Sequence, residues 1–236
     1  MGRFKGFADR DGKFFKALAK NQRKDWFEAH RADYEEGWQK PMGDLLVDLK
    51  EAVDRTFSHC DLGEPKVFRI YRDVRFSKDK SPYKTHIGGY LPMKRSGKAA
   101  GAPAAIYVHV GPEPFAAAGH YMMEGEDLAR YRAAVLDDKR GKELVKIIAK
   151  LEKKGFSVEA RESLVRVPKG IDPEHPRANL LKNKGLVATF PKMPVPEFDF
   201  ATSSSQGIAA GSGPGSRPLT SPTTLLPSFS SQVGPA

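Results

Sequence analysis

The stretch Phe68–Phe76, with the sequence FRIYRDVRF, decides the expected fold because its residues alternate in polarity. Successive side chains of a strand point to opposite faces of a sheet, so a period of two predicts a strand here. The apolar and polar faces are Phe68, Ile70, Val74 and Phe76 against Arg69, Tyr71, Asp73 and Arg75. Arg72 falls on the apolar face, where an unpaired charge is costly. We therefore expect it to pair with Asp25 or Glu28, or the strand to carry a bulge.

Further strands and helices are expected around this stretch. Strand-like patterns cover residues 85–92, 104–110, 115–122, 164–167 and 186–190, and residues 95–103 are expected to form a long hairpin loop. Apolar side chains recur at helical spacing in the first 57 residues, where Pro41 is expected to open a helix, and again in residues 126–137 and 142–153. Gly155 is expected to end the last helix. This order predicts an α+β fold with a mostly antiparallel sheet and an N-terminal helical segment.

The composition changes abruptly near Phe200. Ser, Gly, Pro, Ala, Thr and Leu dominate the segment from Ala201 to Ala236, in which Arg217 is the only charged side chain. Such a segment cannot bury enough apolar surface to offset the entropy lost on ordering. We therefore expect one α+β domain over residues 1–199 and a disordered tail over residues 200–236. The sudden loss of charge also suggests that the tail comes from a shifted reading frame, which the gene sequence would test.

Composition also bounds the compartment and the partners. The single cysteine, Cys60, excludes an intramolecular disulfide and fits a reducing compartment. The first residues have no continuous apolar segment of the signal-peptide kind, and no stretch approaches 18 uninterrupted apolar residues, so a cytoplasmic protein with no membrane association is expected. The net charge of +10 favours anionic partners, although solvated lysine-rich faces would give the same excess.

Several segments resemble one known family. The run Arg72–Lys84, RDVRFSKDKSPYK, resembles the signature of a bacterial and fungal family known only as domain of unknown function 2461. Similar matches are Asn21–Phe27, Leu128–Arg132, and a late Pro-rich loop formed by Arg166–Gly170, His175–Pro176 and Leu180–Lys182. The resemblance covers roughly residues 4–198. It implies an α+β fold and no activity, because the family carries no assigned one.

The cations after residue 68 form the main candidate site. One hypothesis is that they bind an anion, with Arg75 as a bidentate clamp. Lys80 and Lys84 would add charge and Tyr83 a stacking face or hydroxyl. The proposed binding residues are Arg72, Arg75, Lys80, Tyr83 and Lys84, and the candidate partners are a phosphate-bearing small molecule or nucleic acid. The alternative is an exposed strand face whose ion pairs contribute about 0.2–1 kcal/mol each.

Catalytic and metal-binding residues are harder to identify. His175, on a Pro-bounded loop near Lys169 and Arg177, is the best acid–base candidate, with Asp73 as a second. Three strand histidines could meet on the sheet, namely His86, His109 and His120. They lack the paired spacing typical of zinc sites, so neither a metal nor another cofactor is expected. The residues leave open an anion-binding module, an enzyme acting on such an anion, and a structural or protein-interaction domain.

Overall fold

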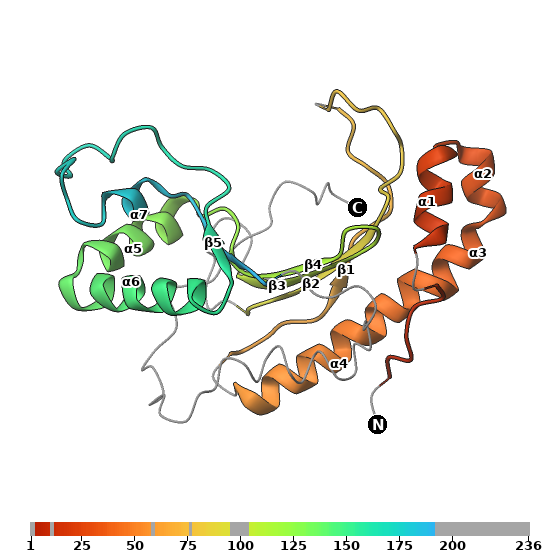
Figure 1. Ribbon diagram of the computed structural model, residues 1–236, viewed down its shortest axis with the longest axis horizontal. Coiled ribbons are helices and arrows are strands. Elements are labelled where there is room, and N and C mark those ends of the chain that lie inside the picture. Colours follow the sequence, from red (N-terminus) through yellow and green to blue (C-terminus); the bar gives the residue numbers. More distant parts are fainter. Residues whose placement is uncertain (1–2, 10–11, 58–59, 76, 95–103, 192–236) are drawn as a thin grey trace. The chain divides into compact units, whose positions relative to one another are not determined.

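The computed structural model describes residues 3–9, 12–57, 60–75, 77–94 and 104–191 (Figure 1). Within them, six strands pair as an antiparallel sheet in the order β1-β2-β3-β4-β6-β5, and helices complete the α+β fold that the sequence predicts. Two compact units divide the chain: residues up to 91 with 107–115, and residues 92–106 with 116–192. The expected hairpin loop at residues 95–103 and the expected tail at residues 200–236 lie outside the described residues, and the single domain over residues 1–199 stays a prediction.

Most of the expected strands are present. The strands are β1 (Lys66–Val67), β2 (Ile87–Pro92), β3 (Ala105–Val110), β4 (Phe115–His120), β5 (Ser157–Glu159) and β6 (Leu186–Thr189). In the first unit Lys66 pairs with Tyr90, and in the second Ala117 pairs with Thr189. The strand predicted at residues 164–167 is wrong, because this segment forms only the Ser163–Asn183 bridge and leaves Val165 exposed.

The stretch that predicted the sheet is itself not a sheet strand. In its described part, residues 68–75, only Tyr71 forms a bridge, to Tyr83. The predicted alternation of burial is nevertheless present, since Ile70 is buried and Tyr71 is exposed. The backbone N–H of Arg75 donates to the Asp73 carboxylate at 3.2 Å. Such a local bond competes with strand pairing at the end of this stretch.

Helices fill the start of the first unit, as expected. They are α1 (Lys13–Lys20), α2 (Lys24–Ala29), α3 (Arg31–Tyr34), the π-helical segment η1 (Glu35–Gln39) and α4 (Lys40–Thr56). The last three run on without a break, so Pro41 lies within a continuing helix rather than at a new start. Proline clashes with the carbonyl four residues earlier, and the wider π-turn just before Pro41 relieves this clash. Aromatic pairs such as Phe15–Trp38, with ring centroids 4.6 Å apart, form the core.

The second unit packs three helices around its own core. They are α5 (Gly125–Leu136), α6 (Asp138–Glu152) and α7 (Ala178–Lys182), drawn in green to blue in Figure 1. Their buried cluster consists of Met123, Tyr131, Val135, Leu144 and Leu181. Helix α6 begins four residues before the predicted position because the side chain of Asp137 caps it, accepting from the backbone N–H of Arg140 at 2.8 Å. Gly155, with φ of 86°, follows the end of α6 as predicted.

Candidate functional site

A pocket of about 540 Å³ in the first unit is the candidate site. Its lining is Thr85, His86, His109, Pro112, Glu113, Pro114 and Phe115. The rings of His86 and His109 stack across it with centroids 3.8 Å apart and planes 24° apart. Two of the three strand histidines named by the sequence therefore do meet. His120 lies near Asp127 in the second unit, and no group of three metal-binding side chains occurs in the part of the chain that the structure describes.

Two glycines let the pocket side chains take these positions. A Cβ at Gly111 would lie 2.8 Å from the Cβ of His86, and one at Gly88 would lie 2.8 Å from the hydroxyl of Tyr107. The first contact involves the least mobile part of the histidine side chain, so a larger residue at position 111 would displace the imidazole. The sequence Gly88-Gly89 thus marks the close approach of two strands.

Burial keeps His86, His109 and the neighbouring Tyr107 neutral at pH 7. Burial, followed by the charges at His109, Lys84 and Arg72, lowers the pKa of His86 to about 3. Burial likewise lowers the pKa of His109 to about 4 and raises that of Tyr107 to about 12. The Tyr107 hydroxyl and His109 Nδ1 are 3.2 Å apart and share a hydrogen bond.

These pKa values predict that the protein loses stability in mild acid. The pKa values of His86 and His109 in the folded state lie below the ordinary value of 6.5, so the unfolded chain takes up protons first as the pH falls. Between pH 7 and pH 4.5 the pair should lower the free energy of unfolding by roughly 2–3 kcal/mol, after allowance for solvent screening. Urea denaturation at both pH values measures this change. His86→Gln should lose about half of the pH dependence attributable to the pair, and an unchanged dependence would contradict the prediction.

Most of the predicted anion-binding residues have hydrogen-bond or packing partners within the protein. Arg75 makes two hydrogen bonds to Asp73, at 2.7 and 3.0 Å, and this pairing lowers the pKa of Asp73 to about 2. Lys80 donates through Nζ to the carbonyl of Val74 at 2.9 Å. Asp73 is thus a firmly ionised partner of an arginine, which makes it a weak proton acceptor at pH 7.

Arg72 and Tyr83 have mainly structural partners. The guanidinium of Arg72 pairs with Asp79 and donates to the Tyr83 carbonyl at 3.2 Å, so the expected partners Asp25 and Glu28 are wrong. The ring of Tyr83 is buried and stacks on Phe27 with centroids 4.5 Å apart. Its position in the core leaves the ring no face for a ligand.

Lys84 differs from the other predicted residues because its amine lies near two further cations and next to the pocket in sequence. Its half-buried amine donates to the carbonyl of Arg69 at 2.9 Å and lies 5.3 Å from the ring centre of Phe68. Burial lowers the pKa of Lys84, and the charges of Arg69 and Arg72 lower it further. We call Arg69, Arg72 and Lys84 the cationic cluster. Within the described residues, Asp79 is the one carboxylate at ion-pair distance from any of the three.

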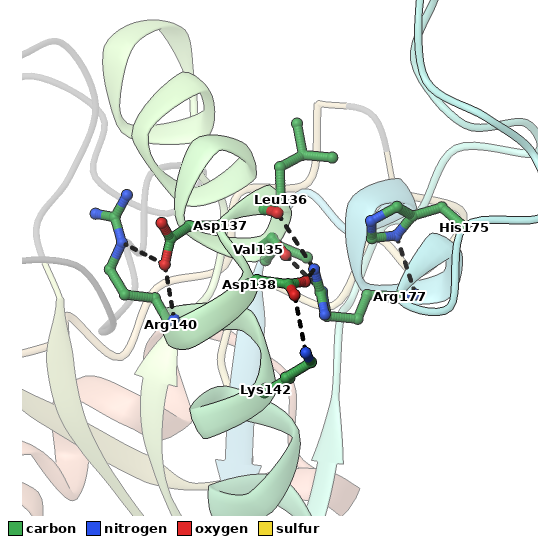
Figure 2. A network of polar contacts seen from close by, with 8 residues as sticks. All are labelled: Val135, Leu136, Asp137, Asp138, Arg140, Lys142, His175 and Arg177. Atoms are coloured by element: carbon green, nitrogen blue, oxygen red, sulfur yellow. Dashed lines mark hydrogen bonds and ion pairs between the residues drawn. The ribbon is translucent and has the colours of Figure 1, made fainter.

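His175, the predicted acid–base residue, takes part in a helix-end network of the second unit. Its Nδ1 accepts the backbone N–H of Arg177 at 3.1 Å (Figure 2). Arg177 is itself buried and donates to the carbonyls of Val135 and Leu136 at 2.7 and 3.2 Å, and to Asp138 at 3.1 Å. Asp73, the second acid–base candidate, belongs to the first unit and not to this network. The contacts of His175 are therefore those of a residue that shapes its own loop.

The sequence reasoning undervalued the stacked histidines. Strand alternation puts His109 and Tyr107 on the same face, but alternation does not reveal which residue of another segment faces a given side chain. The available signal was the combination of His86 before a Gly-Gly pair and His109 just before Gly111. Gly88 allows the close approach of Tyr107, and Gly111 allows that of His86.

The fold and the pocket define an antiparallel α+β protein with a small cavity that carries paired, uncharged histidines. The model of the conserved hypothetical protein family DUF2461 matches residues 12–205, and the chain belongs to this family. No curated protein and no solved structure matches it. Among the described residues, no helix is both long and apolar enough to cross a membrane.

Proposed function

We propose that this protein binds a small anionic ligand, of the phosphate-bearing kind, at the cationic cluster. The observation that carries the proposal is the position of the half-buried Lys84 amine, which donates to the carbonyl of Arg69 at 2.9 Å and lies close enough to the charges of Arg69 and Arg72 for them to lower its pKa. Like charges held together in a partly buried place repel one another, and an anion placed among them would turn that repulsion into attraction. The cluster would thus gain stability from the ligand that it binds.

The proposed binding residues differ in part from those that the sequence suggested. Arg72 and Lys84 stay in the set, and Arg69 joins them. Three residues are removed from the set: Arg75 pairs with a carboxylate, Lys80 donates to a backbone carbonyl, and Tyr83 is buried in the core. The charges of Lys84 and Arg72 act on His86, which supports placing the ligand beside the pocket. A pocket of about 540 Å³ favours a small molecule over a nucleic-acid backbone.

Lys84→Met is expected to weaken phosphate binding at least tenfold. The experiment is a thermal-shift titration with inorganic phosphate at low ionic strength, with affinities from calorimetry. Phosphate at 100 times its Kd stabilises the folded state by about 2.7 kcal/mol, which raises the Tm by several degrees. The wild-type protein should show this shift and Lys84→Met should not.

Lys80→Met is the matched control for this test. Nζ of Lys80 also donates a hydrogen bond to a backbone carbonyl, and replacing Lys80 removes the same charge as replacing Lys84. Lys80 lies outside the cationic cluster. The affinity of the Lys80→Met variant for phosphate should stay within about twofold of the wild-type value, because the lost charge is exposed. A wild-type protein that phosphate does not stabilise, or an equal loss in both variants, would rule out a specific anion site at Lys84.

A further inference from the structure

We infer that the pocket beside the cationic cluster holds the organic part of the ligand, and that His86 is the group in it that takes up a proton when the anion binds. The inference rests on the proposed function, because the anion is taken to lie at Arg69, Arg72 and Lys84. It adds His86 as a binding residue, with His109 and Tyr107 as the residues that position its ring, and a narrower class of ligand.

The ring of His86 can hydrogen-bond a ligand in the pocket. It lines the pocket, and it stacks on the ring of His109. In residues 3–9, 12–57, 60–75, 77–94 and 104–191, no hydrogen-bond partner meets either ring nitrogen of His86. A neutral imidazole has one N–H donor and one acceptor nitrogen. Both are therefore available to a ligand in the pocket.

His109 and Tyr107 hold this ring in place rather than compete for the ligand. The hydrogen bond between the Tyr107 hydroxyl and His109 Nδ1 fixes the orientation of the His109 ring, against which His86 stacks. Gly88 gives Tyr107 room for its hydroxyl, and Gly111 lets His86 lie next to the strand. Glycine at two separate positions, each required by one of these side chains, indicates that the arrangement is built into the fold.

The surroundings of His86 predict that an anion would charge it. The groups that act on His86 are His109 of β3, together with Lys84 and Arg72 of the cationic cluster, and all of them disfavour a proton on its ring. A dianion bound among these cations would cancel their repulsion and attract a proton to the nearest imidazole. Ligand binding should therefore be accompanied by proton uptake at His86.

Glu113 narrows the class of ligand. Its exposed carboxylate lines the same pocket and accepts hydrogen bonds without donating any at neutral pH. It would repel a second anionic group but would accept bonds from hydroxyl or amino groups. A small phosphate monoester with hydroxyl groups on its organic part therefore fits both ends of the site, with the phosphate at the cluster and the hydroxyls at Glu113.

Proton uptake can be measured by calorimetry with inorganic sulfate as the probe. Sulfate stays a dianion from pH 5 to pH 8, so any proton taken up comes to the protein. Titrations at pH 6 in two buffers of different ionisation enthalpy should show uptake by the wild-type protein. Its affinity for sulfate should rise about tenfold between pH 8 and pH 5. His86→Gln should show no uptake and an affinity that no longer depends on pH.

The outcomes separate this inference from the proposed function. Absence of sulfate binding at any pH would overturn the anion site itself. Binding without proton uptake, or uptake that persists in His86→Gln, would leave the anion site intact and overturn the role of His86. Uptake that persists would assign the proton to another group, such as Lys84, whose pKa is also lowered.

Chemical labelling of the wild-type protein tests the same inference if His86→Gln does not fold. Diethyl pyrocarbonate acylates neutral imidazole nitrogens, and peptide mass spectrometry reports each histidine separately. Saturating sulfate should slow the labelling of His86 at least fivefold and leave His175 of the second unit unchanged. Equal labelling of His86 with and without sulfate would contradict the placement of the ligand in the pocket.

Discussion

Gly141→Ala is expected to destabilise the protein by about 3 kcal/mol, although alanine is the better helix former. Gly141 lies in the first turn of α6, where a Cβ would be 2.3 Å from the carbonyl oxygen of Val135 and 2.6 Å from Nε of Arg177. The carbonyl belongs to the backbone and cannot turn away without breaking the bond that it accepts from Arg177. The gain of about 1 kcal/mol in helix propensity is smaller than this clash. Urea denaturation followed by circular dichroism measures the change.

Gly43→Ala is the control that isolates the clash from helix propensity. Gly43 lies within α4, and a Cβ there would meet nothing within 4 Å. This variant should gain up to about 1 kcal/mol of stability, because alanine loses less entropy in a helix than glycine does. The opposite signs of the two changes are the expected result. Stabilisation by both would show that α5 and α6 do not approach as closely as described.

Arg177→Met is expected to destabilise the protein by about 3–5 kcal/mol, the largest effect predicted for a single side chain. Arg177 is 6% exposed and donates to the carbonyls of Val135 and Leu136, which no longer have helical partners because α5 ends there (Figure 2). A cation at this end also interacts favourably with the helix dipole. Methionine keeps most of the apolar stem but leaves the carbonyls without a donor, and each unsatisfied group costs about 1–3 kcal/mol.

Arg140→Met at the same helix junction is the matched control. Arg140 lies largely in solvent and pairs with Asp137 at 3.5 Å, so its loss should change the free energy of unfolding by less than about 1 kcal/mol. Both variants remove one arginine charge within one network (Figure 2). Equal, small effects on the urea midpoint would show that the buried bonds of Arg177 contribute little. A large effect of Arg140→Met would point instead to net charge.

The candidate site was only partly predictable from the sequence. The run rich in lysine and arginine between residues 69 and 84 contains the cationic cluster, and His86 follows two residues after its end. It did not show that Arg75 would be held by Asp73 two residues before it, since a turn rather than a strand joins the two. An acid–base role for His175 stays a prediction, and its Nδ1 accepts a local backbone hydrogen bond that loop composition alone does not reveal.

Hydrophobic periodicity and short motifs are local properties of the chain, so they sufficed to predict the type of most helices and strands, the α+β class and the family. Which side chains meet depends on the tertiary structure. Arg177 reaches the carbonyl of Val135, 42 residues earlier, and His86 stacks on His109 from another strand. Contacts of this kind depend on strand order, on helix ends and on the room left by Gly88, Gly111 and Gly141. No local pattern encodes them, since each joins segments that lie far apart in the sequence.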